Sequence, residues 1–145
     1  MIVSALLLAV ASPGDCPELS GADASSKCRL AQSLRQLDDL DCQADDSQMA
    51  MNVCSYREYL RADIELNDTW DKIAARYHGD DSDDPVWQSI LKAQRAWLAF
   101  RDAQCEIWRE YYKGGTIAPL MSNSCLADLT GQRIAQLQEL LEQGN

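Results

Sequence analysis

Apolar residues recur every three or four positions in four separate stretches of the chain, which is the spacing of amphipathic helices. The first stretch covers 22–40, and the second begins after Ser47, a good N-cap residue, and ends near Gly79. No stretch has the strict alternation of apolar and polar residues that is typical of a β-strand. The sequence therefore predicts an all-α fold, a small antiparallel helical bundle with short connections.

Two more helix boundaries have local signals. Asp84 as N-cap and Pro85 in the first helical position predict the start of the third helix, and the glycines at 114–115 predict its end. The last helix is expected to begin at Ser122 or Asn123, either of which is a suitable N-cap.

The two long helices have predicted core-facing stripes. The stripe of the second helix consists of Met49, Val53, Tyr56, Leu60, Trp70, Ala74 and Tyr77. The stripe of the third helix consists of Trp87, Leu91, Leu98, Cys105, Trp108 and Tyr112. Trp97 lies off this stripe, beside Leu98, so it is the tryptophan that we expect to serve a second surface, as a contact for a partner.

Five polar residues fall where these stripes call for core residues: Asp63, Asn67, Gln94, Arg101 and Arg133. If the helices joined by the 79–84 loop run antiparallel, their equal rise of about 1.5 Å per residue places Asp63 level with Arg101. The same construction across 113–122 places Arg133 level with Arg101. Because buried charges must be paired, we interpret these residues as a structural network that fixes helix register.

A catalytic or anion-binding site is the alternative interpretation of this network. A hydrolase would need a second carboxylate, or a nucleophile with a base, and the stripes supply neither. The sequence therefore predicts no enzymatic activity and no cofactor.

The chain has 145 residues, the length of one domain, and a net charge of −10. This charge disfavours nucleic acid and anionic membrane as partners and favours a basic protein. Three aspartates, Asp80, Asp81 and Asp83, lie in one loop. The loop lacks the EF-hand glycine and glutamate, since Pro85 and Leu91 stand at those positions, so no metal is expected. A solvated loop is the preferred interpretation, and a contact with a basic partner is the alternative.

The N-terminal residues 1–11 form an apolar run that ends in a small-x-small pattern and is too short to span a bilayer. This run predicts a signal peptide and export without membrane insertion. Six cysteines in a chain of this length support export, because disulfides form in oxidising compartments. They are Cys16, Cys28, Cys42, Cys54, Cys105 and Cys125.

No pair of these cysteines forms a CxxC motif and the chain has one histidine, so structural disulfides are favoured over a metal site. Six cysteines allow fifteen pairings, and the sequence alone does not choose among them. We predict Cys42–Cys54, Cys105–Cys125 and Cys16–Cys28, because each of these links closes a short loop. A Cys54–Cys105 link is the competing arrangement.

Several short motifs lie between 41 and 141. The most specific is the run AQRAWLAFRDAQC at 93–105. The others are DCQA at 41–44, QMAMNVC at 48–54, ADIELN at 62–67, GGT at 114–116, CL at 125–126 and TGQR at 130–133. Together these motifs resemble the LprI-type lysozyme inhibitors. The resemblance implies a bacterial, extracytoplasmic helical domain at 41–145, preceded by a signal peptide at 1–11 and an N-terminal extension with a short helix at 12–40.

Three functions are consistent with these observations. The resemblance implies an inhibitor of lysozyme, a small basic hydrolase that cuts peptidoglycan. The second function is binding of another envelope target, such as an immunity-type inhibitor of a peptidoglycan amidase. The third is a small-ligand carrier or enzyme that uses Asp63, Arg101 and Arg133. The third function needs a concave pocket that reaches Arg101, whereas the first two need an exposed patch.

Overall fold

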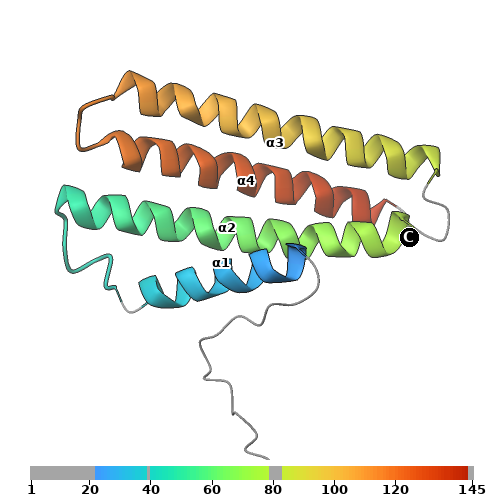
Figure 1. The fold of residues 1–145 in the computed structure, drawn as a ribbon, viewed down its shortest axis with the longest axis horizontal. Helices are drawn as coiled ribbons and strands as arrows, with labels where there is room; N and C mark the ends of the chain where they lie inside the picture. Colours follow the sequence, from blue (N-terminus) through green and yellow to red (C-terminus); the bar gives the residue numbers. More distant parts are fainter. Residues whose placement is uncertain (1–21, 39, 79–82, 144–145) are drawn as a thin grey trace, which may run out of the picture.

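The computed structural model describes residues 22–38, 40–78 and 83–143, and these residues form four helices (Figure 1). The helices are α1 (Ala22–Asp38), α2 (Gln48–Tyr77), α3 (Pro85–Tyr111) and α4 (Ala118–Glu142). No residue within the described ranges lies in a β-strand, so the all-α prediction is confirmed.

The helices lie side by side in the order α3, α4, α2, α1, and successive helices along the chain run antiparallel (Figure 1). α4 packs against both α2 and α3, and α1 packs against α2. Hydrogen bonds join α2 to the turn before α4 and to the end of α4: Asn52 Nδ2 donates to Thr116 O at 2.8 Å, and Tyr77 Oη donates to Leu140 O at 2.8 Å. α2 and α4 are therefore parallel and in register.

The predicted N-caps of α2 and α3 are present. Ala50 N donates to Ser47 Oγ at 3.2 Å. Asp84 Oδ1 accepts from the backbone N–H groups of Val86 and Trp87 at 2.8 and 2.9 Å. These side chains satisfy donors that the first turn of a helix leaves without an intrahelical acceptor.

The predicted start of the last helix was wrong. α4 begins at Ala118, one turn before Ser122 and Asn123, and Pro119 lies in its first turn. A proline is tolerated there because its missing N–H would have had no intrahelical acceptor. Gly114, with φ of +84°, supplies the left-handed residue of the connection between α3 and α4.

The main hydrophobic core joins α2, α3 and α4 toward the end of the molecule where α3 begins. Its buried members are Leu66, Ile73, Trp87, Ile90, Ile134 and Leu137. The predicted stripes deviate from this core. Met49 and Tyr56 are 77% and 43% exposed, and Leu98 and Trp108 are each 36% exposed. The core faces instead include small and polar residues such as Ala50, Ser55, Thr69 and Gln94, which a search for large apolar residues passes over.

Arginines of α2 attach the shorter helix α1. Arg57 Nη1 donates to Leu40 O at 2.7 Å, and Arg61 Nη2 lies 2.9 Å from Asp38 Oδ1. The Asp38–Arg61 pair is exposed on both sides, so we expect it to contribute little to stability.

Two disulfides staple the bundle, as predicted. Cys42–Cys54 ties the loop before α2 to that helix, with Cα atoms 5.9 Å apart. Cys105–Cys125 ties α3 to α4, with Cα atoms 5.5 Å apart. Cys16 of the predicted Cys16–Cys28 link lies outside the described residues, as does the predicted signal peptide, whereas Cys28 lies in α1. None of the described helices combines the length and the apolarity needed to cross a bilayer.

Candidate functional site

Arg101 lies inside the bundle, where α2, α3 and α4 meet, and its side chain is 7% exposed. Its Nη1 donates to Asp63 Oδ1 at 3.0 Å and to Thr130 Oγ1 at 3.4 Å. Its Nε and Nη2 both reach Asp102 Oδ1 at 2.9 Å. The juxtaposition of Asp63 and Arg101 that the antiparallel register predicts is therefore present, and Arg101 links three helices.

Aromatic rings complete the surroundings of this guanidinium group. Arg101 Cζ lies 5.3 Å from the ring centroid of Trp97 and 5.6 Å from that of Tyr59. Trp97 also packs under Arg133, whose Cζ is 5.8 Å from the ring centroid. Trp97 is thus half-buried between two cations and against the core, and not on the separate surface that the sequence predicted. These distances permit cation–π attraction.

The other predicted members of the network bond elsewhere. Arg133 Nε donates to Gln94 Oε1 at 2.9 Å, and Thr130 takes the place opposite Arg101 that the sequence assigned to Arg133. The shift of one turn follows from the earlier start of α4. Asn67 Nδ2 donates to the backbone carbonyl of Asp63 in its own helix, at 2.9 Å.

Burial and charge act against each other at Arg101. Burial alone would lower the pKa of its guanidinium group, but Tyr59, Asp102 and Asp63 outweigh this effect and raise the pKa. Burial raises the pKa of Tyr59, and the nearby negative charge of Asp63 raises it further. Burial also lowers the pKa of Arg133. Arg101 therefore remains a cation and Tyr59 remains neutral near neutral pH.

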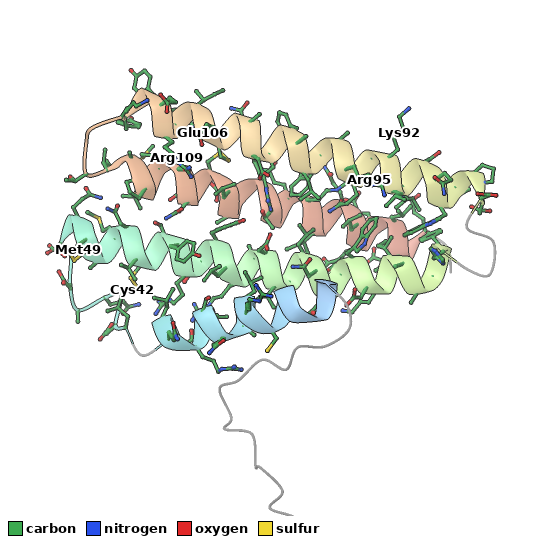
Figure 2. All side chains as sticks on the ribbon, in the orientation of Figure 1. Cys42, Met49, Lys92, Arg95, Glu106 and Arg109 are labelled. Atoms are coloured by element: carbon green, nitrogen blue, oxygen red, sulfur yellow. A yellow bond between two sulfur atoms is a disulfide. The ribbon has the colours of Figure 1, made fainter. Side chains whose placement is uncertain are left out.

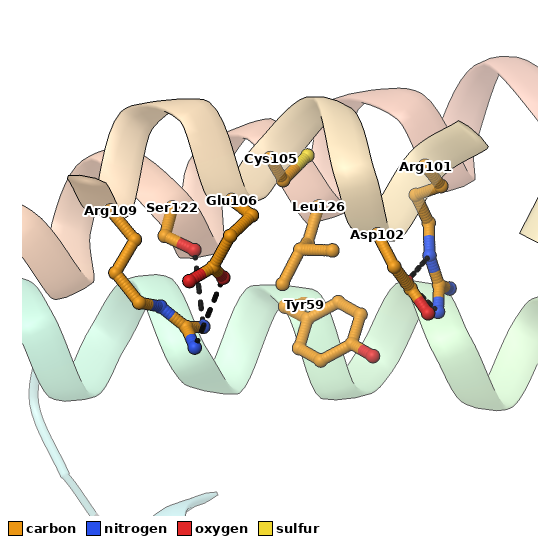
Figure 3. Close-up of a pocket in the computed structure, with 8 residues that line it drawn as sticks. All are labelled: Tyr59, Arg101, Asp102, Cys105, Glu106, Arg109, Ser122 and Leu126. Atoms are coloured by element: carbon orange, nitrogen blue, oxygen red, sulfur yellow. Dashed lines mark hydrogen bonds and ion pairs between the residues drawn. The ribbon is translucent and has the colours of Figure 1, made fainter. Parts of the chain in front are cut away.

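Two hollows lie on either side of Arg101. One, of about 340 Å³, is lined by Asp63, Asn67, Trp70, Gln94 and Leu98 together with Leu66 and Arg101. The other, of about 270 Å³, is shown in Figure 3. In this second hollow Arg109 lies 3.3 Å from Glu106 and donates to Ser122 at 3.4 Å, while Arg101 and Asp102 pair at the opposite end (Figure 3).

The charges around these hollows are already paired with each other. Asp63 and Asp102 bind Arg101, and Glu106 binds Arg109. Within the part of the chain that the structure describes, no three His, Cys, Asp or Glu side chains gather as metal ligands would. Arg101 therefore connects α2, α3 and α4, and the charged groups named here are paired with each other.

The acidic loop is only partly described. Asp80 and Asp81 lie outside the described residues, and Asp83 is exposed just before α3.

Sequence reasoning missed three neighbours of Arg101, namely Tyr59, Asp102 and Thr130. The helical register contained a signal for Thr130, which lies one turn before Arg133 on the same face of α4.

Comparison with known proteins identifies the family of the chain that carries this network. The family model described as Lysozyme inhibitor LprI matches residues 39–137. The chain belongs to the LprI lysozyme inhibitor family. It is also 37% identical, over 123 residues, to an uncharacterized protein of Rhizobium meliloti (strain 1021). That match covers 79% of this chain and 88% of the relative. No solved structure matches the chain significantly.

The LprI match coincides with the three-helix core. It contains the whole of α2 and α3, most of α4 and both described disulfides, whereas α1 lies outside it. Every residue of the Arg101 network also lies within it. The LprI match therefore covers the part of the chain that contains this network.

Proposed function

We propose that this LprI-family protein is exported and inhibits a basic peptidoglycan hydrolase, a lysozyme, by binding it, without chemistry of its own. The observation that carries the proposal is the family match over 39–137, which includes all of α2 and α3. The net charge of −10 supports it, because complementary charge speeds the encounter with a cationic enzyme.

Export is the part of the proposal that rests on cysteine chemistry. The disulfides Cys42–Cys54 and Cys105–Cys125 are stable in oxidising compartments such as the bacterial periplasm. The apolar run at 1–11 would serve as the signal peptide. We propose a periplasmic or secreted location.

In this proposal the Arg101 network has a structural role. Arg101 carries one positive charge and pairs with two carboxylates, Asp63 and Asp102, so the group as a whole is not cationic. An anionic ligand would have to displace one of these carboxylates from a guanidinium group whose side chain is only 7% exposed. Fixing the register of α2, α3 and α4 requires no such displacement.

A small-ligand carrier is the second candidate, and one observation favours it: Arg101 lines both hollows. Arg109 is the more accessible cation there, with a side chain that is 57% exposed and an exposed partner in Glu106. If the hollow in Figure 3 bound the functional ligand, Arg109→Ala would abolish function. If the protein is an inhibitor with its contact elsewhere, Arg109→Ala would leave inhibition unchanged.

The decisive experiment measures retention of the mature protein on immobilised lysozyme and its effect on lysozyme-driven lysis of bacterial cell walls. We expect stoichiometric retention and slower lysis. Cytochrome c, a basic protein that is not a lysozyme, is the matched control and should not bind at moderate salt, because non-specific attraction between exposed charges is screened. Equal retention of both proteins, or undiminished lysis with the inhibitor in excess, contradicts the proposal and favours an immunity-type target.

A further inference from the structure

Helix α3 has a second apolar stripe, on a face that none of the other described helices covers. The stripe, here called the outer stripe, consists of Val86, Ala93, Ala96, Phe100, Ala103 and Ile107. All six are exposed, and Phe100 and Ile107 are 52% and 54% exposed. At 100° per residue, the outer stripe lies roughly 130° around the helix from the buried stripe. α3 forms one edge of the row of helices, so another molecule can reach this face (Figure 1).

The spacing and the sizes of these residues suit another helix. Steps of three and four residues are the heptad spacing of helices that pack along their length. The alanines at 93, 96 and 103 leave room for a second backbone to approach. A shallow hollow of about 480 Å³ lies on this side of α3, lined by Ala103, Glu106, Ile107, Glu110 and Tyr111. A flat patch of large side chains would have no such indentation.

Charges on one flank of the outer stripe reverse sign along the helix. Lys92 and Arg95 lie in its first half, and Glu106 and Glu110 in its second half (Figure 2 labels the first three). Within the described ranges, Lys92 and Arg95 have no carboxylate at ion-pair distance. Glu106 and Glu110 pair only with residues three positions on, at exposed sites where such pairs are weak and easily exchanged.

We propose that the outer stripe is a dimer interface in which two copies of this chain pack their α3 helices antiparallel, with the two-fold axis at Phe100. Antiparallel packing about that axis sets Ala93 against Ile107 and Ser89 against Tyr111 of the second copy, so small side chains meet large ones. It sets Phe100 against itself. Because the two-fold axis brings the same flank of each helix together, Lys92 and Arg95 reach Glu106 and Glu110 of the second copy.

The sequence of α3 favours a second copy over an unrelated helix and the antiparallel over the parallel arrangement. A parallel two-fold pair would instead bring opposite flanks of the two helices together, so Lys92 and Arg95 would not face Glu106 and Glu110 of the second copy. Size and charge both reverse about Phe100, and this reversal is what a helix that binds its own antiparallel copy requires. The Lys92 and Arg95 stems of one copy would lie across the hollow of the other, beside Glu106 and Glu110.

Sedimentation velocity of the mature protein, at concentrations from about 2 to about 200 µM, tests the proposal. We expect a concentration-dependent dimer. Phe100→Asp should raise the dimer dissociation constant at least about a hundredfold, because it sets two carboxylates against each other at the centre of the interface. Met49→Asp, a matched change at a 77% exposed apolar residue of α2, should leave the constant unchanged.

Charge reversal tests the register. The double variants Lys92→Glu/Arg95→Glu and Glu106→Lys/Glu110→Lys should each dimerise at least about tenfold more weakly, whereas an equimolar mixture of the two should form the heterodimer. Under mild oxidation, Phe100→Cys should cross-link to itself. Val86→Cys should not, because the two copies of position 86 would lie about 40 Å apart at 1.5 Å per residue.

Any of four results overturns the inference: a monomer at all concentrations, a dimer that Phe100→Asp does not weaken, double variants whose mixture does not associate, or self-cross-linking at position 86 as efficient as at position 100. Lysozyme inhibition is measured on the same variants. If the parent protein is a monomer and Phe100→Asp abolishes inhibition, the outer stripe is the surface that binds the hydrolase, and the dimer is contradicted. A dimer that does not inhibit lysozyme would contradict only the proposed function.

Discussion

Replacement of Arg101 by alanine is the perturbation that best separates a structural network from a binding site. The guanidinium group of Arg101 is the only contact that joins Asp63, Thr130 and Asp102 among the described residues. Alanine removes it while leaving the three acceptors in place. The Asp63 carboxylate, with 22% of its side chain exposed, then has no cation to pair with inside the bundle.

The magnitude follows from the burial of each lost contact. Removing one partner of a fully buried ion pair costs about 3–5 kcal/mol, and Asp63, which keeps some hydration, accounts for about 2–3 kcal/mol. The bond to Thr130, a fully buried hydroxyl, adds about 1 kcal/mol. Cation–π contacts with Trp97 and Tyr59 add about 1 kcal/mol. The Asp102 side chain is 64% exposed and contributes under about 1 kcal/mol. Because these contacts share one side chain, their contributions do not add in full, and we expect Arg101→Ala to destabilise the fold by about 3–5 kcal/mol.

Urea denaturation, followed by tryptophan fluorescence and circular dichroism with the disulfides intact, measures this loss. Arg109→Ala is the matched control, since Arg109 is 57% exposed and pairs with an exposed glutamate, and it should cost under about 1 kcal/mol. Lysozyme binding by the Arg101→Ala protein that remains folded should be nearly unchanged. If Arg101→Ala were as stable as the parent protein but no longer bound lysozyme, the network would be a functional site and the reasoning would be refuted.

Three further measurements test other parts of the structure. Replacing Cys105 and Cys125 together by alanine should cost about 2–4 kcal/mol in the same denaturation assay, and non-reducing peptide mapping of the parent protein should find these two residues linked to each other. Changing three aspartates of the 80–83 loop to asparagine should slow association with lysozyme in stopped-flow experiments if the loop faces the enzyme; an unchanged rate would mean that the loop is merely solvated. The folded-state pKa of Tyr59 is raised, so the unfolded chain loses the phenol proton first and stability should fall as the pH rises above 10.0; Tyr59→Phe should reduce that fall, as measured by urea titrations across this range.

Helix starts were predictable where a side chain caps the helix. Ser47 and Asp84 have local hydrogen bonds that depend on a few neighbouring residues, so the sequence specifies them directly. The start of α4 has no side-chain cap at Ile117. The position of this start is set by packing against α2 and by the hydrogen bond between Asn52 and Thr116, two residues that are 64 positions apart in the sequence. A local search for caps has no access to such a contact.

The same difference explains which part of the polar network was predictable. The loop between α2 and α3 is short, so their antiparallel register follows from counting residues, and Asp63 and Arg101 do meet. The register of α4 inherits the error in its start, and this error moved Arg133 one turn too close to Arg101. A contact predicted by counting is thus only as accurate as the helix boundary from which the count begins.

The error on α3 has another origin, because the predicted stripe shares Trp87 and Cys105 with the buried face but was chosen from large apolar residues alone. The predicted stripe ran through Leu98 and placed Trp97 outside, whereas Trp97 packs between Arg101 and Arg133 and Leu98 is 36% exposed. The buried face of α3 includes Gln94 and Arg101, so it is less apolar than a core face usually is. The exposed face, with Phe100 and Ile107, is more apolar than solvent requires. Polar groups of α3 face inward because the network pairs them. The apolar residues of its exposed face would be shielded from water if a second molecule packed on that face.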